Sequence, residues 1–325
     1  MGTAMLEIKG LQKRYPIYGK GGKLFRPKDY MSAVSGLSLR LYEGETYGLV
    51  GESGCGKSTT GRMLLGLTKP DAGEIFYGGQ DLVKLTEREF RPLRRELQLV
   101  FQDPLFSLNP RQRIGALLEE PLLIHKMGDG ESRRRQVMEI LGQVGLTEEH
   151  YFRYPHELSG GQVQRLGIAR ALIIRPKLIV CDEPVSALDV SIQAQILNML
   201  TALQGEMHLS LLFISHDIGV VRYLSHRIGV MYLGTLVEEA ETDLLFAEPR
   251  HPYTKALLSA VPRPGGGKPT MLQGELPVRT EGFRGCVFHT RCPHATDLCR
   301  THPPELRQLS PGHKVACHLS AENPW

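Results

Sequence analysis

The segment GESGCGKST, from Gly51 to Thr59, limits the fold of this chain more than any other part of the sequence. It matches the pattern G-x-x-x-x-G-K-[ST] and follows ETYGLV, which we expect to form a strand. After it, Met63, Leu64 and Leu67 recur at helical spacing. A strand, a glycine-rich loop and a helix in this order predict an α/β fold in which the loop cradles phosphate groups.

The residue types in this loop predict how it binds a nucleotide. Glycines let successive backbone N–H groups point at phosphate oxygens, Lys57 would neutralise the β- and γ-phosphates, and Ser58 would bind Mg²⁺. We therefore expect ATP and Mg²⁺ as ligands; the alternative is a structural turn between a strand and a helix. The residues expected at the nucleotide are Gly51, Ser53, Gly54, Cys55, Gly56, Lys57, Ser58 and Thr59.

A pair of carboxylates supports the nucleotide interpretation. In LIVCDEP, four apolar residues precede Asp182 and Glu183, so a buried strand would carry both acids to the edge of the sheet where the phosphate loop lies. Asp182 is then expected to hold Mg²⁺, and Glu183 to orient or deprotonate the attacking water. A helix N-cap would explain one acid but not both.

The remaining hydrophobic patterns predict the order of the elements. Apolar and polar residues alternate over residues 5–15 and predict a strand. A second strand fits SGLSLRL, residues 35–41, and a loop rich in Gly, Lys and Pro lies between the two. Residues 90–157 are predicted to form a helical insertion, in which one helix is interrupted at Pro121. Strands at 177–183 and 210–216 flank a helix and predict a right-handed crossover in a parallel sheet. A Pro-rich stretch after Phe246 reads as a link to a small C-terminal module.

Composition excludes several classes of protein. The net charge of +4 is small for 325 residues, so we expect no nucleic-acid partner. No apolar run reaches 18 residues, and the first ten residues lack the apolar stretch of a signal peptide. We therefore expect a globular protein that neither spans a membrane nor is exported by the usual route.

Further motifs resemble those of one family. LSGGQ, from Leu158 to Gln162, resembles the signature of the ABC ATPases and lies between the two nucleotide motifs, as in that family. Gln102 in LVFQDP resembles the Q-loop glutamine, Asp189 ends a D-loop-like SALD, and His216 in FISHD resembles the switch histidine. Val163 and Val185 stand where many relatives carry a basic residue and Thr, which removes no reacting group.

The resemblance implies a fold and a division into domains. It implies a P-loop NTPase with a RecA-like parallel sheet, an antiparallel β subdomain and a helical subdomain at about 91–165. The nucleotide-binding domain would span residues 1–250, and a small cysteine-rich extension residues 251–325.

The resemblance also implies that one chain does not complete a site. Two cassettes of this family pack head to tail, with ATP between the phosphate loop of one and the signature of the other. Ser159 and the signature backbone would then donate to a γ-phosphate carried by another chain. The residues implied at this face are Ser159, Gly160, Gly161, Gln162 and Asp189.

Catalytic roles follow from the same resemblance. Glu183 would act on the water, His216 would contact the γ-phosphate, and Gln102 would lie near Mg²⁺, alongside Lys57. For stacking on adenine, Tyr15 in KRYP is the candidate, with Tyr18 or an ordinary core tyrosine as alternatives.

The C-terminal part contains a cluster of cysteines. Cys286, Cys292, Cys299 and Cys317 are separated by five, six and seventeen residues, and in a reducing cytosol they would not form disulfides. Four thiolates suffice for zinc or for an iron–sulfur cluster, but the tight pairs usual in structural zinc sites are missing.

The segments around these cysteines extend the resemblance. HPYTKALLSAVP and GCVFHTRCPHA resemble the C-terminal extension of oligopeptide and dipeptide importer ATPases, which implies a [4Fe–4S] cluster on the four cysteines. A zinc site and four free buried thiols remain the alternatives, since the neighbouring histidines could share in binding zinc. These histidines are His289, His294, His302 and His318.

Together these resemblances imply the motor of a bacterial peptide importer. The expected partners are a different sister ATPase, two transmembrane permease subunits and, through them, an extracytoplasmic substrate-binding protein. The expected location is peripheral, at the cytoplasmic face of the inner membrane. Nickel or glutathione uptake and a soluble, non-transport ABC ATPase are the alternatives, and the latter would typically show two cassettes or paired CxxC motifs.

Overall fold

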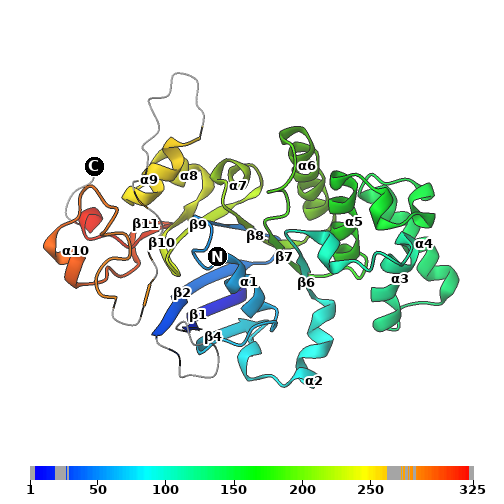
Figure 1. Cartoon of the computed structure of the whole chain (residues 1–325), viewed down its shortest axis with the longest axis horizontal. Helices are drawn as coiled ribbons and strands as arrows, with labels where there is room; N and C mark the ends of the chain where they lie inside the picture. Colours follow the sequence, from blue (N-terminus) through cyan, green and yellow to red (C-terminus); the bar gives the residue numbers. More distant parts are fainter. Residues whose placement is uncertain are drawn as a thin grey trace. The chain divides into compact units, whose positions relative to one another are not determined.

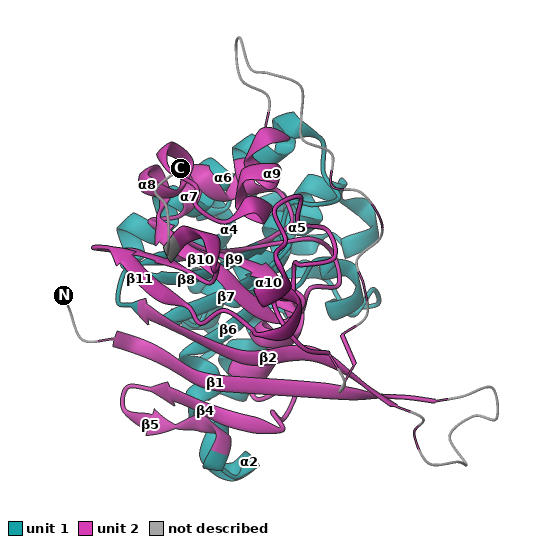
Figure 2. Cartoon of the chain, turned by 90° about the vertical axis from the view of Figure 1, so that its left-hand side faces the viewer, with its two compact units in different colours: residues 1–3, 42–46, 84–214 teal, residues 4–41, 47–83, 215–325 magenta. Residues whose placement is uncertain are grey.

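A computed structural model describes residues 4–18, 27, 29–261, 272, 274, 277, 279–280 and 283–321 (Figure 1). Its contacts divide the chain into two compact units, coloured separately in Figure 2. The helical unit comprises residues 1–3, 42–46 and 84–214, and the phosphate-loop unit comprises residues 4–41, 47–83 and 215–325.

Two sets of strands build the phosphate-loop unit. Its first sheet has the order β2-β1-β4-β5, and its second set the order β11-β12-β10-β9-β3. In the second set β3 and β9 are parallel, whereas the other neighbours are antiparallel. The strands of this unit are β1 (Ala4–Ile17), β2 (Asp29–Tyr42), β3 (Thr46–Val50), β4 (Ala72–Tyr77), β5 (Gln80–Asp81), β9 (Arg227–Tyr232), β10 (Thr235–Glu241), β11 (Arg307–Ser310) and β12 (His313–Val315).

Alternating side chains explain the first sheet. Leu6 and Ile8 of β1 are buried and stand opposite Tyr77 and Ile75 of β4, which are buried as well. Successive side chains of a strand point to opposite faces, so this register gathers the apolar residues on one face. The antiparallel subdomain expected from the family resemblance is confirmed.

Short helices complete this unit. They follow or precede its strands and contribute buried apolar residues such as Met63 and Leu64 of α1. They are α1 (Lys57–Leu64), the 3₁₀ helix η2 (Leu82–Lys84), α7 (Ile218–Leu224), α8 (Thr242–Ala247), α9 (Pro252–Ser259), α10 (Asp297–Thr301) and η7 (Leu319–Ala321).

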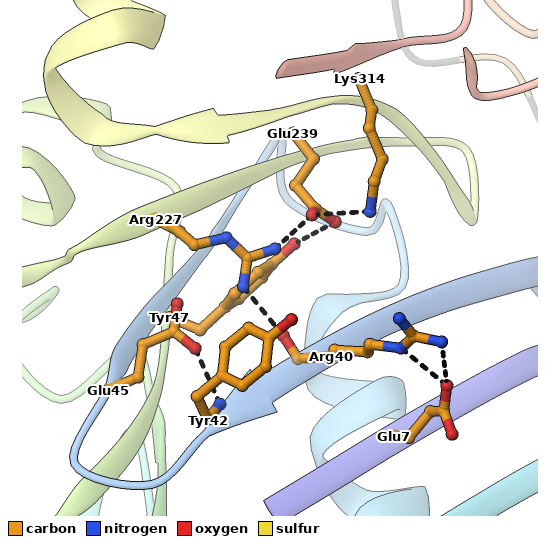
Figure 3. Close-up of polar contacts among 8 residues, drawn as sticks. All are labelled: Glu7, Arg40, Tyr42, Glu45, Tyr47, Arg227, Glu239 and Lys314. Carbon is orange, nitrogen blue, oxygen red and sulfur yellow. Dashed lines mark hydrogen bonds and ion pairs between the residues drawn. The ribbon is translucent and has the colours of Figure 1, made fainter. Parts of the chain in front are cut away.

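A buried carboxylate connects three strands of the phosphate-loop unit (Figure 3). Glu239 of β10 is only 2% exposed. Its carboxylate accepts hydrogen bonds from Tyr47 Oη and from Lys314 Nζ, both at 3.2 Å. It also forms an ion pair with the guanidinium group of Arg227. A buried charge is costly unless it is paired and hydrogen-bonded. These three partners lie on β3, β9 and β12. Their contacts with Glu239 therefore connect β12, near the end of the chain, to the buried strands of the unit.

The helical unit contains parallel strands and most of the longer helices. β6, β7 and β8 run parallel, with Leu97 opposite Leu178 and Asp182 opposite Ile214. Every residue of β7 and β8 is buried, as expected for apolar runs in a parallel sheet. The strands are β6 (Leu97–Val100), β7 (Leu178–Asp182) and β8 (Ser210–Ser215).

The helices of this unit include the predicted insertion. They are α2 (Glu87–Phe90), η3 (Arg91–Arg95), η4 (Pro104–Ser107), α3 (Ile114–Ile124), α4 (Gly130–Gln143), η5 (Glu148–Phe152), η6 (Pro155–Glu157), α5 (Gly160–Leu172) and α6 (Val190–Met207). The helix α6 joins the parallel strands β7 and β8, which confirms the predicted strand–helix–strand unit. A helical subdomain is confirmed, while its bounds at about 91–165 stay a prediction.

Two local predictions were wrong. The helix α3 continues through Pro121 instead of breaking there, because Leu117, Leu118 and Leu122 are buried and the packing outweighs one lost hydrogen bond. The Pro-rich link contains α9, which begins with Pro252 at its first position, where proline is favoured. The rest of that link, residues 262–269, and much of the predicted loop at 16–30 lie outside the described residues.

Candidate functional site

The phosphate loop follows β3, and its glycines stand where no side chain fits. A Cβ at Gly56 would lie 2.1 Å from the carbonyl oxygen of Ala33, and a Cβ at Gly51 would lie 2.1 Å from that of Met231. Gly56 also has a φ of 105°, a conformation that favours glycine. The pattern therefore has a steric cause at both of these positions.

Lys57 begins α1 and folds its side chain back over the loop. Its Nζ donates to the carbonyl oxygen of Gly51 at 2.7 Å and to that of Glu52 at 3.1 Å, and the residue is 3% exposed. A buried ammonium group needs such oxygen partners. The loop thus holds a cation at the N-terminal end of α1, where the helix dipole also favours anions.

The other predicted loop residues differ in exposure. Ser53 and Gly54 are exposed, and Ser58 and Thr59 in the first turn of α1 are half-buried. Cys55 is 1% exposed, and burial raises the pKa of its thiol, so that it stays neutral at ordinary pH. Cys55 therefore contributes packing beneath the loop and is no nucleophile.

His216 lies in the phosphate-loop unit, directly after the end of β8. The next residue, Asp217, caps α7 by accepting hydrogen bonds from the N–H groups of Gly219 at 2.8 Å and Val220 at 3.3 Å. The N–H of Asp217 itself donates to Ser215 Oγ at 3.0 Å. The exposed imidazole of His216 thus projects from a short segment fixed on both sides.

Tyr15 lies near the end of β1 and is 36% exposed. The Nζ of Lys13 lies 5.6 Å from the centroid of its ring. Tyr18, the alternative, follows the same strand and is 40% exposed. Both rings are accessible, and their exposure does not distinguish between them.

Asp182 and Glu183 lie at the end of β7 in the helical unit. Asp182 is 7% exposed and is the last residue paired with β8. The N–H of Glu183 donates to the carbonyl oxygen of Ile214 at 3.0 Å, and its φ is 48°. This left-handed conformation is strained for a residue with a side chain by about 1–3 kcal/mol. It turns the chain sharply after the strand, and strain of this kind is found mostly at functional positions.

Gln102 contacts Glu183. Its Nε2 donates to Glu183 Oε2 at 3.4 Å, although the two residues are 81 positions apart. The parallel pairing of β6 with β7 brings the ends of these strands together. The amide of Gln102 therefore contacts the carboxylate predicted to act on water.

The signature residues form the start of α5. Ser159 caps the helix: its Oγ accepts from the N–H of Gln162 at 3.4 Å, and Gln162 Oε1 accepts from the N–H of Ser159 at 3.0 Å. Gln162 Nε2 lies 3.2 Å from His150 Nε2. Ser159 and Gly160 are exposed, and Gly161 is half-buried. A hydroxyl that accepts one hydrogen bond can still donate its own hydrogen, so the helix start offers donors to an anion.

Asp189 lies at the start of α6. It is the N-cap residue of that helix but makes no side-chain hydrogen bond to it. Gln193 of α6 instead donates from its Nε2 to the carbonyl oxygens of Val185 at 3.0 Å and Leu188 at 2.9 Å. The D-loop-like segment is therefore fixed by α6, and Asp189 is exposed.

The predicted residues are divided between the two units. The phosphate loop, Tyr15 and His216 belong to the phosphate-loop unit. Gln102, the signature, Asp182, Glu183 and Asp189 belong to the helical unit. Within each unit the predicted residues occur at strand ends and helix starts, where backbone groups and charged side chains are available.

Two contacts of these residues had no signal in the sequence pattern. His150 contacts the signature glutamine, and Glu52 inside the phosphate loop is contacted by Arg291 at 2.8 Å and by Tyr253 at 2.9 Å. Glu52 stands at a variable position of the loop pattern, and its partners lie 201 and 239 positions away.

The four C-terminal cysteines are close enough to affect one another. Cys286 and Cys299 are 7% and 5% exposed, and Cys292 and Cys317 are half-buried; none forms a disulfide. Burial, together with smaller effects of the three other thiols, raises the pKa of Cys286 to about 11. The backbone of Cys286 also donates to the carbonyl oxygen of Cys299 at 2.7 Å.

These cysteines are not arranged as ligands. Within the described ranges, no group of three or more His, Cys, Asp or Glu side chains is placed to hold a metal ion. Two neighbouring histidines contact backbone carbonyls instead, His289 that of Cys286 at 2.7 Å and His318 that of His302 at 2.9 Å.

Among the helices of the described part of the chain, none is both long enough and apolar enough to cross a bilayer.

Two known families match the sequence. The ABC transporter family matches residues 34–186, which include the phosphate loop, the signature and the two carboxylates. The family described as oligopeptide/dipeptide transporter, C-terminal region, matches residues 237–299.

Curated relatives match over nearly the whole chain. The oligopeptide transport ATP-binding protein AppF of Bacillus subtilis is 49% identical over 321 residues, which cover 97% of both chains. The oligopeptide transport ATP-binding protein OppF of Escherichia coli is 50% identical, covering 96% of this chain and 95% of the relative. The dipeptide transport ATP-binding protein DppF of Haemophilus influenzae is 46% identical, covering 97% and 96%.

Solved structures share the fold. The ATP-binding cassette MJ0796, in a dimeric post-hydrolysis state bound to ADP and Pi, has a TM-score of 0.65 and 32% sequence identity. The similarity covers 73% of this chain and 99% of that one. The fold predicted from the motifs is thus confirmed.

Proposed function

This chain belongs to the ABC transporter family of ATP-binding proteins, and from that premise we propose that it is the ATP-hydrolysing motor of an importer of dipeptides or oligopeptides. The observation that carries the proposal is the identity of about half of all residues with oligopeptide transport ATP-binding proteins, over nearly the full length of both chains. The match extends through the C-terminal region, which is described for oligopeptide and dipeptide transporters.

The phosphate loop would bind the nucleotide as MgATP. Lys57 is charged and held over the loop by two carbonyl oxygens, which a phosphate group can replace as its partners. Ser58 and Asp182 would supply oxygen ligands to Mg²⁺, which prefers them, and Gln102 would lie near the ion. Tyr15 would stack on adenine.

Hydrolysis would depend on the carboxylate of Glu183. Its strained backbone and its contact with Gln102 place restrictions on the orientation of this side chain. Glu183 would orient and deprotonate the attacking water, and His216 would stabilise the charge on the γ-phosphate. Gln102 links this carboxylate to the segment that follows β6, so a change at the site would be passed on through that segment.

The signature would serve a second cassette. Ser159 and the N–H groups at the start of α5 would bind the γ-phosphate on a sister ATPase, which we propose is a different chain. Asp189 would face the same partner. A cassette that is similar in fold is described as dimeric, which supports pairing as such.

The chain would work at the cytoplasmic face of the inner membrane, bound to two permease subunits that receive peptide from an extracytoplasmic binding protein. Nickel or glutathione import is the alternative within this class, because a motor subunit does not touch the cargo. A soluble, non-transport ABC ATPase is the other alternative. The similarity of the C-terminal region to peptide transporters favours peptides.

Glu183→Gln tests the proposed chemistry. It keeps the size of the side chain but removes the base, so MgATP should still bind while turnover falls about 100-fold or more. Hydrolysis and nucleotide affinity should be measured with the full chain beside Glu139→Gln, an exposed carboxylate of α4 that pairs with Arg175 at 3.7 Å on the surface. Turnover of Glu183→Gln at the wild-type rate would refute the role of this residue.

We also propose that the four C-terminal cysteines hold a [4Fe–4S] cluster, with zinc as the alternative. The burial of Cys286 and Cys299 and the effect of the three other thiols on the pKa of Cys286 support this. Anaerobically purified protein should show broad absorbance at about 400 nm together with iron. Colourless protein with one equivalent of zinc would favour the alternative, and protein without either metal would leave four free thiols.

A further inference from the structure

Two side chains of the C-terminal segment contact the second residue of the phosphate loop. Arg291 NH1 lies 2.8 Å from Glu52 Oε2, and Tyr253 Oη accepts a hydrogen bond from the N–H of Glu52 at 2.9 Å. Both residues lie within the match to the C-terminal region of peptide transporters, and all three belong to the phosphate-loop unit. Glu52 precedes Tyr253 by 201 residues and Arg291 by 239 residues. The C-terminal segment therefore acts on a loop that is far from it in the sequence.

The contact with Tyr253 fixes a peptide group that also holds Lys57. The N–H of Glu52 and the carbonyl of Gly51 belong to one planar trans peptide, so they point in opposite directions. Tyr253 accepts from the N–H, and the carbonyl oxygen accepts from Lys57 Nζ at 2.7 Å. The second oxygen partner of Lys57 is the carbonyl of Glu52 itself, at 3.1 Å. The position of Lys57 thus depends on the position of Glu52.

The two side chains that hold Glu52 are themselves held firmly. The side chain of Arg291 is 8% exposed, and its NH1 also lies 3.4 Å from Tyr232 Oη. The rings of Tyr232 and Tyr253 pack at 4.7 Å between centroids, and Phe288 packs on Tyr232 at 5.2 Å. A packed aromatic cluster and a shielded ion pair make a stiff support, because neither can relax without exposing apolar surface or an unpaired charge.

We propose that the C-terminal segment sets the affinity of the phosphate loop for nucleotide, with Arg291 and Tyr253 as positioning residues that act through Glu52. This inference rests on the proposed binding of MgATP at the loop. The segment pre-organises the Gly51–Glu52 peptide, and with it Lys57, so that binding does not have to order the loop. Loss of the contact of Glu52 with Arg291 or with Tyr253 leaves the residues proposed for hydrolysis intact. It therefore weakens the binding of MgATP without changing the rate of hydrolysis.

Binding and turnover of the full-length protein test this inference. Arg291→Ala should weaken binding of MgATP about tenfold and Tyr253→Phe about fivefold, with kcat at saturating ATP unchanged within about twofold. Arg291→Lys keeps the charge and should restore part of the affinity. Arg300→Ala is the matched control: it lies in the same segment, is exposed, and pairs only loosely with Asp297 at 3.9 Å.

A double-mutant cycle separates positioning from a general loss of structure. In a Glu52→Ala background, Arg291→Ala should cost little more affinity, because its partner is already lost. Equal losses in both backgrounds would overturn the inference, as would unchanged affinity in both Arg291→Ala and Tyr253→Phe. Tyr253→Phe retains the ring packing and carries the test if Arg291→Ala does not fold.

The wild-type chain distinguishes this inference from the proposed function. If wild type binds MgATP and the variants bind it equally well, only the inference fails. If wild type binds no MgATP, the proposed function fails and the inference with it.

Discussion

Single residues of the phosphate loop were predictable where chemistry requires one residue type. Glycine at positions 51 and 56 and a lysine at position 57 follow from the pattern, and the structure gives each a steric or electrostatic reason. The backbone of Glu183 was not predictable, since a positive φ favours glycine or asparagine. The contacts of Arg291 and Tyr253 with Glu52 were not predictable either, because they join residues far apart in the sequence.

Lys57→Ala tests the residue that contributes most charge to the loop. Removal of the ammonium group should weaken MgATP binding by about 10- to 100-fold, as expected for a lost charge-assisted contact to phosphate. Titration calorimetry with the full chain checks this, with Lys9→Ala as the control, because Lys9 is exposed and pairs with Glu7 at 3.1 Å. Equal affinities of Lys57→Ala and wild type would contradict the role of Lys57.

At the scale of elements, hydrophobic patterns predicted the strands and helices better than the connections between them. The apolar runs at 177–183 and 210–216 became β7 and β8, because buried parallel strands have no polar alternation to obscure them. The helix α9 was missed because its Pro-rich flanks resemble a linker. Its cap, in which His251 Nδ1 accepts from the N–H of Tyr253 at 3.1 Å, had no sequence signal.

The cap of α9 makes stability depend on pH. His251 is 1% exposed, and burial lowers its pKa to about 4 from 6.5. Below pH 6.5 the unfolded chain takes up this proton before the folded chain does, so stability falls as the pH falls towards 4. Between about pH 7 and about pH 5, the titration of His251 therefore lowers the free energy of unfolding by about 2 kcal/mol.

His251→Asn isolates this contribution, because asparagine can still cap the helix but does not titrate. Glu238, which accepts from the N–H of His251 at 2.9 Å and contacts His313 at 2.7 Å, remains in both proteins. Denaturation by urea at both pH values should give a flatter pH dependence for the variant than for wild type. Parallel pH profiles would contradict a titrating histidine at this cap.

At the scale of the whole molecule, the family and the fold were predictable from the motifs. The division of the chain into its two compact units was not. The phosphate-loop unit combines segments from both ends of the sequence, because β12 pairs with β10 and Glu239 binds Lys314. Such pairings are non-local, and no pattern within one segment encodes them. The expected boundary near residue 250 stays a prediction, as do the partners and the cargo.

Peptide uptake by the reconstituted transporter measures the proposed motor role as a whole. The full complex of this chain with its sister ATPase, both permeases and the binding protein would be placed in vesicles, with MgATP supplied to the ATPase side. A labelled oligopeptide should accumulate with the wild-type chain and not with Glu183→Gln. Equal accumulation with both chains, or ATP hydrolysis without any uptake of peptide, would contradict the role proposed here.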